Sequence, residues 1–204
     1  MSSLPSRETF ESSYQGKPPW DIGKAQPILV GAADRVTGSV LDAGCGTGEN
    51  ALFFAERGRP VLGIDYLEGP VREARRKAAE RGLDAEFQVV DALDLASLDR
   101  RFDSVIDSGL FHVFSDEDRA RYVAGLAHVL KPGGRLFLLC FSDEEPGTQG
   151  PRRVTRQDLL AAFSNGWEVE EIQPVRFEVR TDVVSASFSE GGPRAWFSVI
   201  RRVG

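Results

Sequence analysis

Cysteine and histidine are scarce in this sequence, which has two of each among 204 residues. Cys45 and Cys140 lie far apart, and no group of cysteine, histidine or acidic residues has the spacing of a metal site. A disulfide framework needs more cysteines than this, so a reducing compartment is the default. We therefore expect a cytoplasmic protein with neither a structural metal nor a disulfide.

Long apolar runs and an excess of basic charge are also missing. The first residues, MSSLPSRE, lack the apolar core of a signal peptide, and no run approaches the length that spans a bilayer. The formal charge is −6, whereas proteins held by nucleic-acid phosphates carry a basic face. These absences predict a protein that binds neither membranes nor nucleic acids. They leave the oligomeric state open between a monomer and a homodimer.

What the sequence does contain is an ordinary share of apolar residues, 41%, arranged in alternating short and long patterns. A chain of this length can form one domain with a substantial core. From residue 39 to residue 141, short apolar runs that predict strands alternate with longer stretches that predict helices. The strands are expected at 39–43, 60–65, 85–90, 102–107 and 135–141, and the helices at 49–57, 69–81 and 116–130. This alternation predicts an α/β fold, a parallel sheet with helices on both faces.

The pattern changes at both ends of the chain. The first 35 residues predict one or two helices, with a break at 17–20. A loop at 143–153 precedes a predicted helix at 155–163 and strand regions at 167–179 and 195–202. Two consecutive strands without an intervening helix predict an antiparallel hairpin that closes one edge of the sheet. No domain boundary is visible, so residues 1–204 are expected to form a single domain.

A glycine-rich loop, residues 42–48 (DAGCGTG), joins the first predicted strand to the helix that follows. Glycines let the backbone turn sharply and let a ligand approach the main chain. The dinucleotide fingerprint G-x-G-x-x-G/A requires a small residue where this chain has Glu49, and a carboxylate there disfavours a pyrophosphate. The loop also lacks the G-K-[ST] ending of a phosphate-binding loop. These details favour a nucleoside ligand without phosphate and disfavour an NAD-dependent oxidoreductase.

The loop and its leading acidic residue resemble motif I of the class I, Rossmann-like methyltransferases, which use S-adenosylmethionine (SAM). Asp65 ends the second strand, Asp91 follows the third, and residues 130–136 (LKPGGRL) resemble the family's turn into the fifth. The resemblance covers residues 38–141 and implies a doubly wound, mostly parallel sheet of seven strands. It also implies that Asp65 binds both ribose hydroxyls and that Asp91 meets the adenine. The cofactor-binding residues expected from it are Trp20, Asp42, Gly44, Cys45, Gly46, Gly48, Asp65, Tyr66, Asp91, Ala92, Asp107 and Ser108.

Each of these features also has a purely structural alternative. The glycines can serve a tight turn, Asp65 can cap a strand end, and Asp91 can form a turn. The turn at 131–134 is structural under either interpretation, so we assign it no chemistry.

The turn after the fourth strand, residues 107–112 (DSGLFH), lies beside the reacting methyl group in this family. Methyl transfer from a sulfonium is an in-line displacement, so the enzyme mainly holds nucleophile and methyl group together, away from water. A base helps only if the nucleophile must lose a proton, and His112 is the candidate. The alternative is a histidine that caps or packs beneath the site. The turn lacks the Asn/Asp-Pro-Pro-aromatic sequence of many nucleobase and protein amide methyltransferases, which favours a small-molecule acceptor.

The segment 18–23 (PPWDIG) is similar to the Trp-Asp-x-Gly segment of small methyltransferases of the thiopurine and halide/thiol type. There the segment folds over the cofactor, so Tyr14 and Trp20 are expected to form an apolar lid whose aromatic faces suit a sulfonium. The alternative is a helix docked by its aromatic residues. Arg152 and Arg153 either bind an anionic acceptor or lie on a solvated loop. The expected acceptor-binding residues are Tyr14, Phe111, His112, Arg152 and Arg153.

Together these features predict lid helices at 1–35, a cofactor-binding core at 36–141, and a substrate loop and hairpin at 142–204. The expected function is transfer of a methyl group from SAM to a small molecule, which leaves S-adenosylhomocysteine (SAH). An aromatic or heteroaromatic hydroxyl or nitrogen is the favoured acceptor, with a thiol or a halide next. The main alternative is a non-catalytic protein that binds SAM.

Overall fold

One seven-stranded sheet runs through the computed structural model, which describes residues 7–16, 18–180, 182 and 188–204. The strands lie in the order β3-β2-β1-β4-β5-β7-β6. Their bounds are Val40–Ala43 (β1), Val61–Asp65 (β2), Ala85–Val89 (β3), Phe102–Ser108 (β4), Leu130–Phe141 (β5), Trp167–Arg176 (β6) and Arg194–Arg202 (β7). The first five strands pair in parallel, and β7 pairs antiparallel with β5 and β6. The predicted fold, a mostly parallel sheet with a C-terminal antiparallel hairpin, is confirmed.

The second strand of that hairpin, β7, lies inside the sheet, and β6 forms the edge. β7 is buried from Ala195 to Ile200, which is typical of a strand covered on both faces. β6 (WEVEEIQPVR) is charged, only partly buried, and contains Pro174. Charge and proline both suit an edge strand, because they discourage pairing with another chain.

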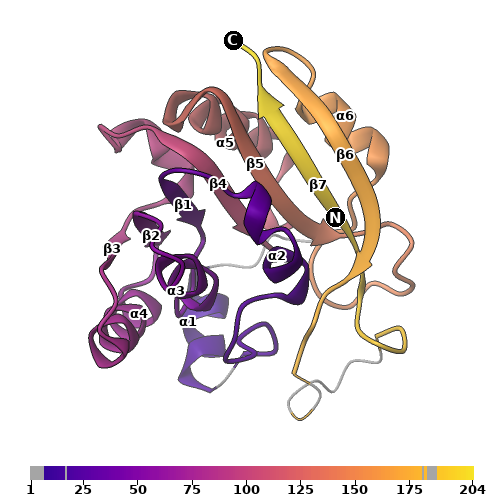
Figure 1. Cartoon of the computed structure of the whole chain (residues 1–204). Coiled ribbons are helices and arrows are strands. Elements are labelled where there is room, and N and C mark those ends of the chain that lie inside the picture. The colour runs from indigo at the N-terminus through magenta and orange to yellow at the C-terminus, as the bar shows by residue number, and fades with distance from the viewer. Residues whose placement is uncertain (1–6, 17, 181, 183–187) are drawn as a thin grey trace.

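Helices cover both faces of the sheet (Figure 1). The α-helices are Arg7–Gln15 (α1), Pro27–Gly31 (α2), Glu49–Ala55 (α3), Glu68–Arg81 (α4), Asp116–Val129 (α5) and Arg156–Ala162 (α6). Short 3-10 helices span Ala33–Arg35 (η1), Ala92–Ser97 (η2) and Phe111–Val113 (η3). Residues of α2, α3 and α4 pack on one face, and residues of η2, α5 and α6 pack on the other. In Figure 1, α1 lies at the lower edge of the molecule, where the parallel strands end.

Local sequence signals explain where several of these helices begin and end. Ser115 accepts a hydrogen bond from the Asp118 N–H at the start of α5, and Thr155 and Asp158 form a reciprocal capping box before α6. Gly82 ends α4 with a φ of 63°, the left-handed conformation that glycine adopts without strain. The predicted helices therefore lie where expected, with small differences at their ends.

Alternate residues of the strands supply two apolar cores, one on each face. In β1, for example, Leu41 belongs to the core under α5 and α6, and Val40 belongs to the core under α3 and α4. Among the residues described, none of the helices is both long and apolar enough to span a bilayer.

Strand β5 begins five residues earlier than the predicted start at 135. Leu130 pairs with Phe102 and Arg135 pairs with Ser104, so the register shifts across the residues KPGG. The predicted turn at 131–134 is therefore an irregularity within the strand, because the pairing with β4 resumes on both sides of it.

Candidate functional site

The glycine-rich loop lies between β1 and α3 at the carboxyl end of the sheet, where open α/β sheets bind ligands. Gly44, Gly46 and Gly48 have φ values of 69°, 54° and 88°, in the left-handed region that other residues avoid. A Cβ at Gly48 would lie 2.8 Å from the Cβ of Ala74 and 2.9 Å from the ring of Phe87. Gly48 thus lets the loop pack tightly against α4 and β3.

Asp42 anchors this loop to the start of α3. Its Oδ2 accepts a hydrogen bond from the Ala51 N–H at 3.0 Å, and its buried Oδ1 has no hydrogen-bond partner among the described residues. Burial raises the pKa of Asp42 to about 7, and the nearby Asp107 carboxylate contributes to the shift. The Cys45 thiol is free and buried in the core under α3 and α4. Both residues hold the loop in shape, and their contact with a cofactor stays a prediction.

Asp65 connects the end of β2 to the glycine-rich loop. Its Oδ2 accepts a hydrogen bond from the Gly46 N–H at 3.1 Å, and its Oδ1 accepts one from the Leu67 N–H at 2.9 Å. The residue is 8% exposed, and burial raises the pKa of its carboxyl group. An ionised carboxylate has about four lone-pair sites, so it can still accept hydrogen bonds from further donors such as ribose hydroxyls.

Asp91 lies close to Asp65, because the Val90 N–H donates to the Asp65 carbonyl at 3.0 Å. The exposed Asp91 side chain accepts a hydrogen bond from the Leu93 N–H at 2.9 Å and so caps η2. The next residue, Ala92, is buried. The structure therefore shows the turn-forming role of Asp91, and its contact with adenine stays a prediction.

Aromatic residues of the N-terminal segment gather over the glycine-rich loop. The Trp20 Nε1–H donates to the Tyr14 hydroxyl at 3.1 Å, and the two rings meet edge-on with centroids 6.0 Å apart. The Phe10 ring lies edge-on to both Trp20 and Tyr66. The Tyr14 hydroxyl is 2.8 Å from the position that a Cβ on Gly46 would take. We call Phe10, Tyr14 and Trp20 the aromatic lid.

The aromatic lid contributes a hydroxyl as well as apolar surface. Burial, together with the Asp65 carboxylate, raises the pKa of Tyr14, so the phenol stays protonated at neutral pH. Because this hydroxyl already accepts from Trp20, its own proton is available for donation. The structure thus brings Tyr14, Trp20, Tyr66 and Gly46 into one cluster, and their contact with a cofactor stays a prediction.

Asp107 holds the turn that follows β4, and its side chain is fully buried. Its carboxylate accepts hydrogen bonds from the Leu110 N–H at 2.8 Å, the Phe111 N–H at 3.1 Å and the Tyr122 hydroxyl at 3.0 Å. Burial raises the pKa of Asp107 to about 6. Asp107 therefore shapes the turn, which begins after Ser108 at the end of β4. Contact of either residue with the cofactor stays a prediction.

Phe111 turns into the core between the sheet and the helices α5 and α6. It has no exposed surface, and its ring centroid lies 5.8 Å from that of Phe163. The Arg119 guanidinium covers the ring at 4.6 Å. The structure therefore gives no support to the prediction that Phe111 contacts the acceptor, because its ring is enclosed by other side chains.

His112, one residue further on, is 5% exposed and neutral. Its Nδ1 accepts a hydrogen bond from the Phe141 N–H at 2.9 Å. Burial lowers the pKa of the imidazole to about 3, and the positive charges of Arg119 and Arg153 act in the same direction. A nitrogen that accepts an N–H carries no proton, so the proton of the neutral ring is on Nε2. His112 is therefore arranged as a hydrogen-bond donor and is poorly suited to act as a base.

Three phenylalanines that the sequence did not indicate as site residues form an aromatic cluster beside His112. Phe141 and Phe177 have ring centroids 5.1 Å and 5.9 Å from that of His112, and Phe188 lies 5.7 Å from Phe141. A Cβ at Gly109 would lie 3.5 Å from both the His112 Nε2 and the Phe177 ring. We call Phe141, Phe177 and Phe188 the aromatic wall. Phe141 could have been found from the sequence, because it ends strand β5 at the edge of the sheet where ligands bind. No sequence pattern indicates Phe177 or Phe188 as site residues.

The predicted arginine pair serves the structure of the 143–153 loop. The Arg153 guanidinium donates to the carbonyls of Glu145 at 3.0 Å and Pro151 at 2.7 Å, and so closes the loop on itself. Arg152 forms an ion pair of 2.7 Å with Asp116 at the start of α5. Both guanidinium groups are already engaged, so binding of an acceptor by these arginines stays a prediction.

Comparison with known proteins identifies the family. Residues 40–134 match the family described as a methyltransferase domain. A 2-heptyl-1-hydroxyquinolin-4(1H)-one methyltransferase of Mycobacteroides abscessus is 36% identical over 199 residues, which cover 91% of this chain and 86% of that protein. This chain belongs to the SAM-dependent methyltransferases.

Two further similarities concern sulfur chemistry. A structure reported for the conversion of a disulfide bond into a thioacetal group during echinomycin biosynthesis is 35% identical, with a TM-score of 0.85 over 97% of this methyltransferase and 93% of that chain. A probable thiol methyltransferase of Arabidopsis thaliana is 29% identical over 152 residues, 72% of this chain and 67% of that protein. The predicted resemblance to small-molecule and thiol methyltransferases is confirmed.

SAM is thus the cofactor of this methyltransferase, and more distant structures of the same fold contain SAM or SAH. The residues at the carboxyl end of the sheet fit it. Gly46 has no side chain over its main chain, the Asp65 carboxylate lies beside it, and the Tyr14 hydroxyl of the aromatic lid lies close to it. Aromatic faces attract a sulfonium cation. When bound, SAM supplies a methyl group that is already activated for transfer.

Proposed function

We propose that this methyltransferase methylates a hydroxyl or a ring nitrogen of a planar aromatic or heteroaromatic small molecule. The observation that carries the proposal is the aromatic wall beside the turn after β4. That turn adjoins the glycine-rich loop, because a Cβ at Gly44 would lie 3.2 Å from the Leu110 side chain. Aromatic side chains favour a flat ring that can stack or meet them edge-on. The M. abscessus relative, named for a hydroxyquinolinone, supports the same class of acceptor.

In this proposal His112 supplies the polar contact within an apolar site. Its Nε2–H donates to an oxygen or nitrogen of the acceptor and so selects the atom that faces the methyl group. Because the pKa of His112 is about 3, the imidazole does not remove the acceptor's proton. A hydroxyl acceptor therefore reacts as its oxyanion, after it has lost its proton to solvent, and a ring nitrogen attacks through its lone pair. The rate enhancement then comes from alignment of this nucleophile with the methyl group, so no side chain has to act as a general base.

A sulfur acceptor is the second candidate, because the echinomycin structure and the Arabidopsis relative both concern sulfur. Sulfur is a weak hydrogen-bond acceptor, so the Nε2–H donor of His112 should position a sulfur acceptor less than it positions an oxygen or nitrogen. Sulfur methylation should therefore depend little on His112, whereas methylation of an aromatic hydroxyl should depend on it strongly. A single substitution at His112 therefore distinguishes the two candidate functions, because it should affect methylation of an aromatic hydroxyl more than methylation of sulfur.

The test begins with calorimetric titration of SAM and continues with SAH release over a panel of acceptors. The panel contains hydroxyquinolines, phenols, nitrogen heterocycles, thiols and iodide. We expect kcat/KM for the best aromatic hydroxyl or nitrogen to exceed that for every thiol and iodide by at least about tenfold, which corresponds to 1.4 kcal/mol. A preference for thiols would overturn the proposal. SAM binding without turnover of any acceptor would instead support the non-catalytic alternative.

A further inference from the structure

Gln26 joins two segments that are far apart in the sequence. Its Nε2 donates to the Glu178 carbonyl at 2.9 Å, and its Oε1 accepts from the Glu178 N–H at 3.1 Å. Gln26 is only 4% exposed. A primary amide carries a donor and an acceptor in one plane, so it can pair with the main chain as a neighbouring strand does. We call this pair of hydrogen bonds the Gln26 clamp.

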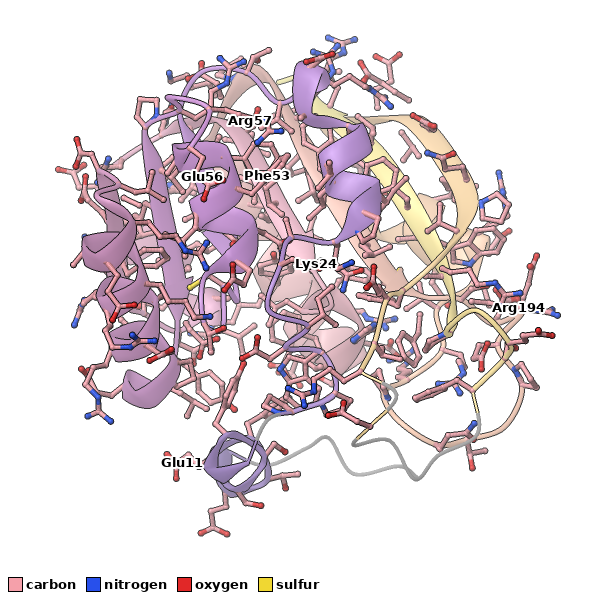
Figure 2. All side chains as sticks on the ribbon, turned by 60° about the horizontal axis from the view of Figure 1, so that its bottom comes forward. Glu11, Lys24, Phe53, Glu56, Arg57 and Arg194 are labelled. Carbon is pink, nitrogen blue, oxygen red and sulfur yellow. The ribbon has the colours of Figure 1, made fainter. Side chains whose placement is uncertain are left out.

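Other contacts join the same two segments. The Arg180 N–H donates to the Pro19 carbonyl at 2.9 Å, and Lys24 forms an ion pair of 2.7 Å with the Glu178 carboxylate. Figure 2, in which the lower edge of Figure 1 comes forward, shows Lys24 on the N-terminal segment near the middle of this edge. The Lys24 and Glu178 side chains are 59% and 40% exposed, so their ion pair contributes little. The buried Gln26 clamp is therefore the stronger side-chain link.

The N-terminal segment is also attached to the cofactor side of the molecule. The Thr47 hydroxyl, in the glycine-rich loop, donates to the Asp21 carboxylate at 3.1 Å. The Gln26 N–H donates to Oδ1 of Asn50, in the first turn of α3, at 3.0 Å. Residues 18–26 therefore contact the glycine-rich loop at Thr47, helix α3 at Asn50 and the segment after β6 at Glu178.

The Gln26 clamp acts next to the aromatic wall, because Glu178 follows Phe177 in the chain. Phe177 is 4% exposed, and its ring packs against His112 and Phe141. We propose that Gln26 is a positioning residue, which couples closure of residues 18–26 over the cofactor to the placement of Phe177 in the acceptor site. The acceptor site itself rests on the proposed function. Coupling of this kind is reciprocal, so a bound acceptor also tightens the binding of SAM or SAH.

Hydrogen exchange with and without SAH tests the coupling in the absence of any acceptor. The Glu178 and Arg180 amides are the reporters, because both donate to the N-terminal segment. In the wild type we expect SAH to slow exchange at residues 176–180 by at least about fivefold, the lower end of typical coupling between sites. Gln26→Met keeps the size of the side chain and removes both hydrogen bonds. It should abolish this slowing while SAH still protects the glycine-rich loop.

Two further variants make the experiment specific. Gln26→Glu retains the acceptor and loses the donor, so it should reduce the effect of SAH at 176–180, and it replaces Gln26→Met if that variant does not fold. Lys24→Ala removes only the exposed ion pair and should behave as the wild type. The proposal is overturned if SAH does not slow exchange at 176–180 in the wild type, or if the slowing is unchanged in the Gln26 variants. The proposal is also overturned if Lys24→Ala abolishes the slowing of exchange at 176–180 as completely as Gln26→Met does.

Steady-state kinetics give a second readout that a purely structural role would not produce. With the best acceptor from the panel, we expect Gln26→Met to lower kcat/KM for the acceptor at least about fivefold while the Kd of SAH alone changes less than about twofold. If kcat/KM for the acceptor falls and the Kd of SAH rises by the same factor, the coupling is contradicted. If SAH slows exchange as expected but no aromatic acceptor is methylated, the proposed function fails and the coupling stands.

Discussion

The main-chain N–H of Phe141 donates a hydrogen bond to Nδ1 of His112 over 2.9 Å. This contact decides the chemistry of the ring, because it leaves the proton of the neutral imidazole on Nε2. Burial, with the charges of Arg119 and Arg153, lowers the pKa of the ring to about 3 and keeps it neutral. The histidine that the sequence suggested as a base is thus arranged as a donor.

His112→Asn tests this arrangement, because asparagine can keep an acceptor near the position of Nδ1 while it removes the Nε2 donor. We expect kcat/KM for an aromatic hydroxyl acceptor to fall about tenfold, the value of one hydrogen bond of about 1.4 kcal/mol. The dependence of kcat/KM on pH should have the same shape in both proteins. A limb with a pKa near the ordinary value for histidine, present in the wild type and absent from the variant, would show that His112 is a base after all.

The same residue should make the fold sensitive to acid. The folded pKa of His112 is about 3, below its ordinary value of 6.5, so the unfolded chain binds the proton first as the pH falls. Its contribution to stability is full above pH 6.5 and is lost toward pH 3. The free energy of unfolding of the wild type relative to His112→Asn should therefore fall by up to about 1.4 kcal/mol per pH unit below 6.5. Urea unfolding at a series of pH values measures this, and a difference independent of pH would contradict it.

The fold and the cofactor side could be predicted because their signals are local. Gly44, Gly46 and Gly48 lie next to the strand that positions them, and their left-handed φ values are what a turn at that point requires. Asp65 and Asp91 each end a strand or follow one, so parallel pairing brings them to the same edge of the sheet. Predicting these features needed only the order of strands and turns.

The acceptor side could not be predicted, because it depends on contacts between distant residues. Phe177 reaches His112 only after β6 and β7 have paired, and Gln26 meets Glu178 across 152 positions of sequence. The structure also gives no support to the predicted acceptor contact of Phe111, because η3 turns this ring into the core while the next residue lies against the aromatic wall. The guanidinium of Arg153 is bound to loop carbonyls, which the sequence does not reveal.

Asp107→Asn should destabilise the turn after β4. The wild-type carboxylate accepts hydrogen bonds from the Leu110 and Phe111 N–H groups and the Tyr122 hydroxyl, and an amide brings a donor into the same place. We expect a loss of about 1–3 kcal/mol in the free energy of unfolding. Asp91→Asn is the matched control, because this exposed carboxylate caps η2 by accepting from the Leu93 N–H, and it should cost less.

The pH dependence of the Asp107→Asn effect has a definite sign. The folded pKa of Asp107 is about 6, above its ordinary 3.8, so the folded protein takes up the proton first. Protonation of Asp107 therefore stabilises the wild type relative to Asp107→Asn as the pH falls from about 6 toward 3.8, and the stability difference between the two proteins grows over that range. Thermal unfolding of both proteins at several pH values checks this. A deficit that shrinks on acidification would show that Asp107 is ionised throughout.

Asp65→Ala should weaken the cofactor site. The carboxylate accepts a hydrogen bond from the Gly46 N–H and is predicted to bind the cofactor's ribose, so its loss should remove charge-assisted hydrogen bonds of about 1.5–3 kcal/mol each. We expect the Kd of SAH to rise by at least about tenfold in calorimetric titration. An unchanged Kd, with the fold intact by circular dichroism, would show that this carboxylate only supports the end of the strand.

Gly46→Ala separates the role of the aromatic lid from that of backbone strain. Gly46 has a φ of 54°, and a Cβ there would lie 2.8 Å from the Tyr14 hydroxyl. Gly58 has a φ of 72° with no atom within 4 Å of its Cβ position, so Gly58→Ala introduces similar strain without touching the lid. Both variants should lose about 1–2 kcal/mol of stability, the cost of a side chain in the left-handed region. Only Gly46→Ala should also raise the Kd of SAH, because the methyl group displaces Tyr14 and narrows the approach to the main chain. If both variants bind SAH as the wild type does, the aromatic lid does not adjoin the cofactor.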